Sequence, residues 1–305
     1  MAFTFLLLLA TLLPAREVAI TIDDLPRGGD APCNAERIRK VTRQLLQPLQ
    51  QQKLPFIGFV NEGRCLDELG EQGMRDVLSM WLEAGGDLGN HTLRHPDFNN
   101  TPLPEYQRQI LAGERITKAL LKAKGRTLRF FRHPFLHAGK TLESKRALEA
   151  FLDQHGYRVA PVTLDNSDWM FAEVYARALR SGDPELARKV KAAYLPYMES
   201  IFEFFEKRSV EVAGHEVRQT LLLHVNQLNA ESMPELLAMM KRRGYRIVSL
   251  ERALEDPAYQ LADEYAGPGG FSWIHRWSKT KNMPGKGEPE EPAFIRADYE
   301  KSRGR

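Results

Sequence analysis

Two adjacent carboxylates end the first predicted strand of the chain. In "TIDDLP", Asp23 and Asp24 follow the apolar alternation "VAI". Successive side chains of a strand point to opposite faces, so in a regular strand one of the two acids would face the core. Asp24 can be explained as the start of a turn, because Asp, Pro and Gly in "DDLPRGG" all favour turns. A second carboxylate at a strand end still needs a cation or several hydrogen-bond donors beside it.

Two histidines that could supply a cation site follow a later predicted strand. His91 and His95 lie four residues apart in "GNHTLRHPDF". We expect the intervening residues to form one helical turn, which places both imidazoles on the same face, and Pro96 to end that turn. Taken alone the spacing is a weak signal, since histidines are more often solvated or satisfied in the core.

The ends of neighbouring parallel strands converge at one face of a βα barrel, so these two stretches are expected to meet. Asp23 or Asp24 can then be the third ligand beside His91 and His95, while the other acid stays free near a bound water. Two imidazoles, one carboxylate and an open position are typical of a hydrolytic zinc site. We therefore expect one divalent metal ion, with zinc as the first choice and cobalt, nickel or manganese as alternatives.

Further polar residues fall at the ends of later predicted strands. They are Arg132, Asp165, Asp168, Trp169 and His224. Each has an ordinary structural explanation of its own: a salt bridge, a helix cap, a core aromatic residue or a satisfied histidine. Their repeated placement at strand ends indicates one functional rim.

Seven apolar or β-branched runs alternate with segments of helical periodicity, which favours parallel βα units, closed into a barrel or left as a doubly wound sheet. The predicted strands are 17–23, 55–60, 86–91, 128–135, 157–164, 220–225 and 245–250. The predicted helices are 35–52, 66–84, 103–124, 141–155, 171–209 and 231–243, and the segment 171–209 is expected to break into two helices at "SGDP".

Composition limits the classes of partner. The 305 residues are 43% hydrophobic, and 43 basic and 40 acidic residues leave a net charge of +3, so no nucleic-acid partner is expected. Residues 1–15 form an apolar run too short for a mature membrane span, and we interpret them as a signal peptide, although no Lys or Arg precedes the run. We expect export to the periplasm or medium, without stable membrane insertion. A mis-assigned start codon or a buried N-terminal strand is the alternative, and would leave a cytoplasmic protein.

The five polar stretches, in this order, resemble the motifs of the polysaccharide deacetylase family, the NodB-homology domain of carbohydrate esterase family 4, from Val18 to Leu250. The resemblance implies a distorted (β/α) barrel with about seven parallel strands. It also implies metal-dependent removal of acetyl groups from N-acetylglucosamine in chitin-like or peptidoglycan polymers or oligosaccharides. On this basis the chain is divided into a signal peptide (1–15), a catalytic barrel (16–255) with a helical insertion (171–209), and a C-terminal surface tail (256–305).

The metal and base are assigned by motif. "TIDD" is similar to the family's TFDD, which implies that Asp23 is the catalytic base and Asp24 a metal ligand. "HTLRH" is similar to its H(S/T)xxH, which implies that His91 and His95 complete the ligand set. "RHPF" resembles its RxPY, in which the arginine, here Arg132, anchors the base.

The remaining roles follow from the later motifs. A backbone N–H at Phe135 would bind the oxyanion, and His224 of "LLLH" would be the catalytic acid. "DNSDW" resembles DxxDW, with Asp168 preferred to Asp165 as the partner of His224. Trp169 and Leu223 are expected to form the apolar pocket for the acetyl methyl group. The chain departs from the family at Phe135, where Tyr is usual, and at Leu136, where Gly is usual.

Two other functions remain open at this point. The barrel could hydrolyse a small amide or cyclic amide, or the chain could be a catalytically dead carbohydrate-binding protein with Trp169, Trp273 and Trp277 as sugar platforms. Retention of both acids, both metal histidines and His224 argues against a dead site. Cys33 and Cys65 would suit one disulfide in an oxidising compartment or two unlinked thiols. The oligomeric state is not indicated.

Overall fold

The computed structural model describes residues 16–29 and 32–302. The segment 1–15, predicted to be a signal peptide, lies outside the described residues. Seven strands in the described part pair in parallel in one curved sheet. They are β1 (Arg16–Leu25), β2 (Phe56–Val60), β3 (Asp87–Asn90), β4 (Phe130–Phe131), β5 (Arg158–Val159), β6 (Gln219–His224) and β7 (Tyr245–Ile247).

The strand order is β5-β4-β3-β2-β1-β6, and β7 pairs with the start of β1. A parallel bridge between Leu164 and Leu221 joins the segment after β5 to β6, which brings the two edges of the curved sheet together. The distorted (β/α) barrel with about seven parallel strands, expected from the sequence, is thus confirmed.

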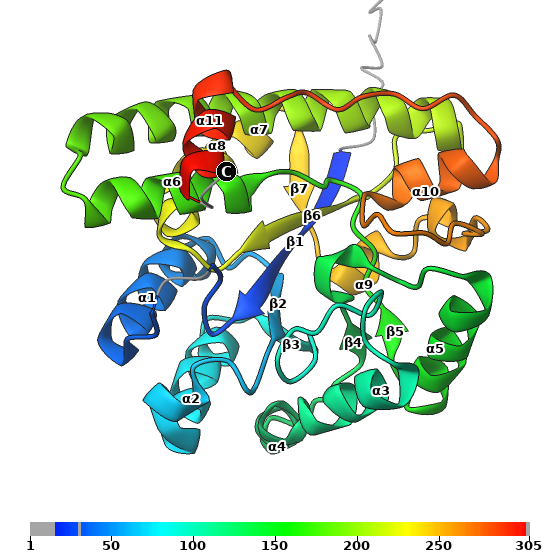
Figure 1. Ribbon diagram of the computed structural model, residues 1–305, viewed down its shortest axis with the longest axis horizontal. Coiled ribbons are helices and arrows are strands. Elements are labelled where there is room, and N and C mark those ends of the chain that lie inside the picture. Colours follow the sequence, from blue (N-terminus) through cyan, green and yellow to red (C-terminus); the bar gives the residue numbers. More distant parts are fainter. Residues whose placement is uncertain (1–15, 30–31, 303–305) are drawn as a thin grey trace, which may run out of the picture.

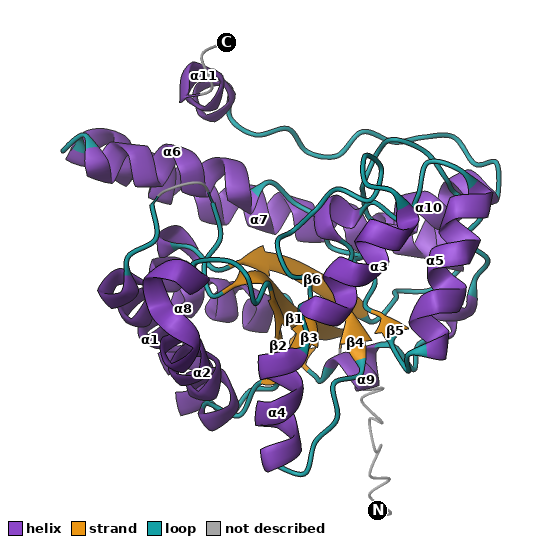
Figure 2. Ribbon diagram, turned by 60° about the horizontal axis from the view of Figure 1, so that its bottom comes forward, coloured by secondary structure: helices purple, strands orange, loops and turns teal. Residues whose placement is uncertain are grey.

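Helices surround the strands (Figure 1). In chain order they are α1 (Ala35–Gln51), α2 (Leu66–Glu83), α3 (Leu103–Ala112), α4 (Arg115–Ala123), α5 (Leu142–Gln154), α6 (Asp168–Arg180), α7 (Pro184–Ala213), α8 (Gln227–Arg242), α9 (Leu250–Ala253), α10 (Trp273–Thr280) and α11 (Ala293–Ser302). Every residue of β1 after Arg16 is buried. Because parallel strands are covered on both faces, β1 carries an almost continuous apolar run up to its two acids. Figure 2 shows the strands enclosed by helices in a second view.

The predicted break at "SGDP" is confirmed, because α6 ends at Arg180 and α7 begins at Pro184. The Asp183 side chain accepts a hydrogen bond from the Leu186 N–H at 2.9 Å, and Pro184 occupies the first helical position, where its missing N–H costs nothing. None of the helices in the described residues is both long and apolar enough to span a membrane.

The single helix predicted over 103–124 is wrong, because α3 and α4 are separate helices that meet at Gly113. A Cβ at Gly113 would lie 2.6 Å from the Leu93 nitrogen and 2.6 Å from the Thr92 carbonyl carbon. The end of α3 therefore packs backbone against backbone on the loop that follows β3, and the helix does not continue through this contact.

Candidate active site

Asp23 and Asp24 face the same cavity because the end of β1 is not a regular strand. The pairing of β1 with β2 shifts register between Ile22 and Leu25, and Asp24 has a φ of 68°. The extra residue and the left-handed conformation break the alternation of side chains. Both carboxylates line the cavity and both are buried. The sheet irregularity therefore explains how two neighbouring acids serve one site.

The Asp24 carboxylate meets both predicted histidine ligands. Asp24 Oδ1 lies 3.6 Å from Nε2 of His91 and 3.4 Å from Nε2 of His95. One ligand atom from each of the three residues lies within 4.8 Å of the others, a grouping that could hold a metal ion. Asp24 Oδ1 is buried with no hydrogen-bond partner among the described residues. A buried, unpartnered carboxylate oxygen aimed at two imidazoles fits a divalent cation.

The charge states of the cluster suit metal binding. Burial and the neighbouring His95 lower the pKa of His91, and burial lowers the pKa of His95 against the opposing effect of Asp24. Burial disfavours ionisation of Asp24, but His95 and Arg64 outweigh it and hold the pKa of Asp24 below its ordinary value. Neutral imidazoles and an ionised carboxylate are the forms that coordinate metals.

The orientation of His91 is fixed from behind. Its Nδ1 lies 2.8 Å from the carbonyl oxygen of Arg132, so Nδ1 carries the proton and donates it to that carbonyl. Nε2 is then the atom with a free lone pair, and it faces Asp24. Such a hydrogen bond behind a ligand histidine selects the tautomer that a metal requires.

The loop that carries His95 is not the helical turn expected from the sequence. Thr92 and His95 have φ values of 71° and 57°, and residues 91–95 form no helix. The loop is held by hydrogen bonds from Leu93 N–H to the Gln109 carbonyl at 2.9 Å and from His95 N–H to Thr92 Oγ1 at 3.1 Å. The two imidazoles still meet, with ring centroids 4.8 Å apart. Two left-handed residues bring them together instead of helical periodicity.

Asp23 lies between the metal-ligand cluster and a buried guanidinium. Asp23 Oδ2 accepts a 3.4 Å hydrogen bond from Arg132, whose other terminal nitrogen donates to Thr21 Oγ1 at 2.8 Å. Asp23 Oδ1 is buried without a hydrogen-bond partner in the described residues. Burial raises the pKa of Asp23 to about 6, although Arg132 acts in the opposite direction. A divalent cation beside Asp23 would favour the ionised form further.

His224 is paired with Asp168 on the opposite side of the site. The two residues lie at the end of β6 and the start of α6, with His224 Nδ1 and Asp168 Oδ1 2.7 Å apart. Asp168 Oδ2 accepts from the His224 backbone N–H at 2.8 Å and from Asn229 Nδ2 at 2.6 Å. Asp165 lines the cavity and makes no hydrogen bond to His224 among those described. The structure thus places Asp168 against His224, as preferred from the motif.

Sequence reasoning missed the residues that hold Asp168 in place. Asn229 in α8 donates to Asp168, and its own Oδ1 accepts from the Tyr194 hydroxyl at 2.6 Å. Tyr194 belongs to α7 and is fully buried. Neither residue falls in a recognisable motif, and only the contact between α7 and α8 brings them to the site.

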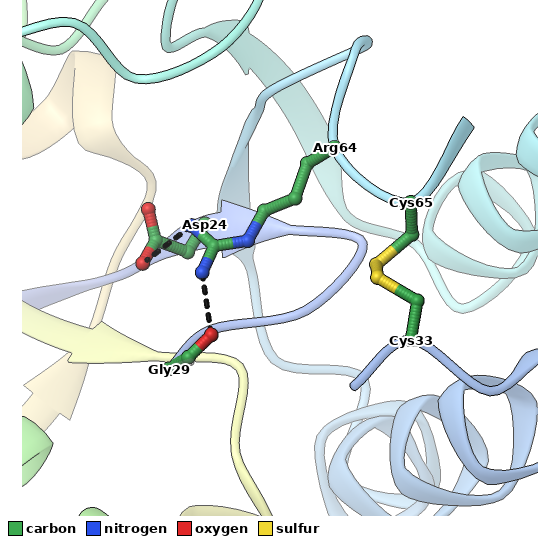
Figure 3. Close-up of a disulfide and its surroundings, with 5 residues drawn as sticks. All are labelled: Asp24, Gly29, Cys33, Arg64 and Cys65. Atoms are coloured by element: carbon green, nitrogen blue, oxygen red, sulfur yellow. Dashed lines mark hydrogen bonds and ion pairs between the residues drawn. A yellow bond between two sulfur atoms is a disulfide. The ribbon is translucent and has the colours of Figure 1, made fainter. Parts of the chain in front are cut away.

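Arg64 is a second residue that the sequence did not single out. Its guanidinium lies 3.4 Å from Asp24 Oδ2 and donates to the Gly29 carbonyl at 2.6 Å (Figure 3). The adjacent Cys65 forms a disulfide with Cys33, so the loops after β1 and β2 are covalently joined beside the site. Of the two alternatives for the cysteines, the structure shows the disulfide. Arg64 thus pairs with Oδ2 of Asp24, whereas the histidines lie near Oδ1.

Both acids, Arg64 and the three histidines of the site line a cavity of about 670 Å³. Phe135 and Trp169 are 53% and 43% exposed and both line it. Phe135 has a φ of 56°, and its ring lies edge-on to His95 at 4.5 Å. A Cβ at Gly270, the last glycine of "GPGGF", would lie 1.7 Å from the Phe135 carbonyl oxygen. A glycine is therefore required there for the C-terminal segment to pack on this turn.

Other expected apolar contacts lie elsewhere. Leu223 is fully buried in the core, whereas its neighbour Leu222 lines the cavity. Of the two residues expected to form an apolar pocket, Trp169 lines the cavity and Leu223 does not, because adjacent strand residues face opposite ways. Trp273 and Trp277 are buried in the core, which excludes them as sugar platforms.

An acid–base pair beside an Asp-His-His cluster provides the groups that a metal-assisted hydrolase requires. Residues 12–160, close to half of the chain, match the family model described as polysaccharide deacetylase. This part of the chain is therefore similar to the polysaccharide deacetylase family, which confirms the resemblance of the motifs that fall within residues 12–160.

Solved structures provide further likenesses. A mutant of BA3943 from Bacillus anthracis, described as a CE4 family pseudoenzyme with restored enzymatic activity, is 18% identical, with a TM-score of 0.50, over 79% of this chain and 68% of that one. The peptidoglycan deacetylase PdaC from Bacillus subtilis is 21% identical (TM-score 0.48; 79% and 91% covered). A family 4 carbohydrate esterase from Streptomyces lividans, in complex with acetate, is 19% identical (TM-score 0.45; 75% and 90% covered). The first of these likenesses supports the shared fold and nothing beyond it.

Proposed function

We propose that the protein is a metal-dependent hydrolase that removes N-acetyl groups from N-acetylglucosamine units of a peptidoglycan-like or chitin-like glycan. The observation that carries the proposal is that the two neighbouring acids make different contacts. Asp24 points its unpartnered oxygen at His91 and His95. Asp23 instead accepts a hydrogen bond from Arg132 through one oxygen, and its other oxygen is buried without a hydrogen-bond partner. A carbohydrate-binding protein needs no such pair.

The metal would be held by Asp24, His91 and His95. When bound there, a divalent cation supplies Lewis-acid activation of water and of the acetamide carbonyl. Zinc is our first choice, because two imidazoles and one carboxylate are a zinc-type donor set. Cobalt, nickel and manganese accept the same donors.

The protein side chains would handle the protons. Asp23 accepts the proton of the attacking water, and Arg132 orients its carboxylate through Oδ2. His224 is charged before reaction, because the Asp168 carboxylate outweighs the effect of burial and raises the pKa of His224 to about 10. His224 gives its proton to the leaving amine, so one proton is accepted and one is donated as the C–N bond breaks.

The cavity wall suits an acetyl group. Trp169 and Leu222 offer apolar surface for the methyl. The Phe135 ring contacts His95, and a backbone N–H of the turn at Phe135 would supply the oxyanion donor. We further propose that the chain acts outside the cytoplasm, since its disulfide suits an oxidising compartment.

The test is acetate release from N-acetylglucosamine oligomers by the purified protein, with added zinc, with a chelator, and after metal is restored. Deacetylation that is lost with chelator and recovered with metal supports the proposal. A panel of small linear and cyclic amides is assayed in parallel. Turnover of those amides with none of the glycans would favour the small-molecule hydrolase instead, and glycan binding without any turnover would favour a binding protein.

A further inference from the structure

The C-terminal residues 284–302, which we call the strap, run along α7 and end in α11 beside α6 (Figure 1). Their attachment is specific. The contacts are Arg208 to the Pro284 carbonyl at 2.8 Å, Lys286 to Glu211 at 2.6 Å, Lys189 over the Phe294 ring at 4.1 Å, and Arg177 to Asp298 at 3.1 Å. Ile295 is fully buried. The strap is thus a docked element of the fold.

The strap covers the loop that positions the proposed catalytic acid. Ser167 Oγ donates a hydrogen bond to Glu291, and the rings of Trp169 and Tyr299 meet edge to face at 5.2 Å and 79°. Between these positions the chain turns inward, where Asp168 holds His224. In "DNSDW", Ser167 and Trp169 therefore contact the strap, whereas Asp168 between them contacts His224.

Two strap residues also line the cavity itself. Glu288 and Tyr299 share its wall with Asp165 and Trp169. Glu288 accepts a hydrogen bond from His275 Nε2 at 3.0 Å, which fixes its carboxylate. Burial and the nearby Glu288 raise the pKa of Asp165 to about 7. The cavity continues from these residues along α1 and α6, past Ile38 and Ala176.

A cavity of about 670 Å³ is in the size range of a whole small-molecule site and is larger than an acetamido group requires. Trp169 remains 43% exposed, and large aromatic side chains left open in a cavity are typical of ligand contacts. The apolar C–H face of a pyranose ring packs on such surfaces, and its hydroxyl groups donate to a fixed carboxylate.

We propose that the strap is part of the substrate site, where Tyr299, together with Trp169, holds the sugar ring next to the unit that is deacetylated, and Glu288 accepts a hydrogen bond from a hydroxyl of that ring. The inference rests on the proposed function, because it assigns the glycan's second unit to that same site. It makes the substrate at least a disaccharide and gives the strap a role in specificity.

The experiment compares the wild-type protein with Tyr299→Ala and Glu288→Gln on N-acetylglucosamine and on its tetramer, tetra-N-acetylchitotetraose. The preference for tetramer over monomer, as a ratio of kcat/KM values, is expected to fall about tenfold in Tyr299→Ala, equivalent to roughly 1.4 kcal/mol. The loss should lie mainly in KM for the tetramer. Tyr299→Phe retains the ring and should restore most of the preference.

Glu290→Gln is the matched control for Glu288→Gln. Glu290 lies two residues away, is 73% exposed and pairs with Arg296 at 2.8 Å on the surface. It should behave as wild type, whereas Glu288→Gln weakens tetramer use. Thermal unfolding of every variant shows whether the strap is still docked. Binding of tetra-N-acetylchitotetraose to protein treated with a chelator, followed by tryptophan fluorescence, gives a readout that requires no turnover.

The outcomes separate the two proposals. If wild type deacetylates the tetramer and both variants retain its full preference and affinity, the strap inference is overturned while the proposed function stands. If wild type binds the tetramer without hydrolysing it and Tyr299→Ala weakens that binding, the strap inference stands and the proposed function fails. If wild type neither binds nor hydrolyses the tetramer, both are overturned.

Discussion

His224, which is partly exposed, and the buried Asp168 form a pair in which Nδ1 and Oδ1 are 2.7 Å apart. The second carboxylate oxygen accepts the His224 backbone N–H and the Asn229 side chain, so both oxygens of Asp168 are used. Burial alone would lower the pKa of His224, but the carboxylate raises it to about 10. The pair therefore favours the charged imidazole at neutral pH, and it uses Nδ1 of the ring but not Nε2.

Replacing Asp168 by Asn is expected to lower the pKa of His224 and to favour its neutral form at pH 7, because the largest of the interactions that oppose burial is lost and only those of Asp24 and Asp23 remain. Turnover should fall by a factor on the order of 100 to 10,000, the usual contribution of a general acid. The alkaline limb of the kcat profile should also move to lower pH. In the metal-loaded wild type that limb should lie below pH 10, since a cation near His224 disfavours its charged form. Asp165→Asn is the control, and its limb should move much less, because Asp165 makes no hydrogen bond to His224 among the described residues.

The same pair predicts how stability depends on pH. The pKa of His224 is raised on folding, so its contribution is fully present below about pH 6.5, the ordinary value for histidine, and is lost as the pH rises through about 10. The free energy of unfolding of the wild type, measured in urea, should fall across that pH window, and that of Asp168→Asn should fall less. Equal pH dependence in the two proteins would contradict a charged His224.

The neighbouring acids Asp23 and Asp24 are expected to respond differently to the same substitution. Asp23→Asn removes a proton acceptor but no metal ligand, so the metal should remain while turnover falls on the order of 100-fold to 10,000-fold. Asp24→Asn should instead lose metal, with activity partly restored by excess metal in the assay. Elemental analysis and kinetics on both variants decide the point. Retained metal in Asp24→Asn together with an active Asp23→Asn would mean that the roles are exchanged.

Much of the fold was predictable from the sequence, because alternation of apolar runs with helical segments reports the βα pattern directly. A strand overlaps each of the seven predicted runs, although β4 and β5 have only two residues each where 128–135 and 157–164 were expected. The break between α6 and α7 follows from local Gly and Pro chemistry. The division at Gly113 was not predictable, since it depends on a backbone contact with Leu93, which lies far away in the sequence.

The residues of the site could be predicted where the residue type itself indicates a chemical role, as for the two acids and three histidines. It was not predictable where ordinary residues act through distant contacts. Arg64 reaches Asp24 from another loop, and Tyr194 reaches Asp168 through Asn229. The prediction of a helical turn before His95 was wrong, because Thr92 and His95 have positive φ angles. Such angles cannot be inferred from periodicity.

Gly113 provides a test of how the His95 loop is positioned. Gly113→Ala introduces a Cβ 2.6 Å from backbone atoms of Thr92 and Leu93, which cannot move aside as a flexible side chain can. The loop should be displaced, with a stability loss of roughly 1 to 3 kcal/mol and a lower metal content. Gly285→Ala is the control, because a Cβ there meets nothing within 4 Å. Full metal content and unchanged unfolding in Gly113→Ala would show that this contact does not position the loop.

The disulfide between Cys33 and Cys65 should make the molecule more stable by restricting its unfolded state. The two cysteines are 32 residues apart, and closure of a loop of that length is worth about 3 to 4 kcal/mol in the chain-entropy model. The double variant Cys33→Ser/Cys65→Ser should lose about this much in urea unfolding, and the reduced wild type should behave like it. Because Arg64 precedes Cys65 and contacts Asp24, the double variant should also release metal at a lower chelator concentration. Mass spectrometry of unreduced protein after alkylation tests the premise, and two alkylated thiols in exported material would contradict the disulfide and the proposal of export that rests on it.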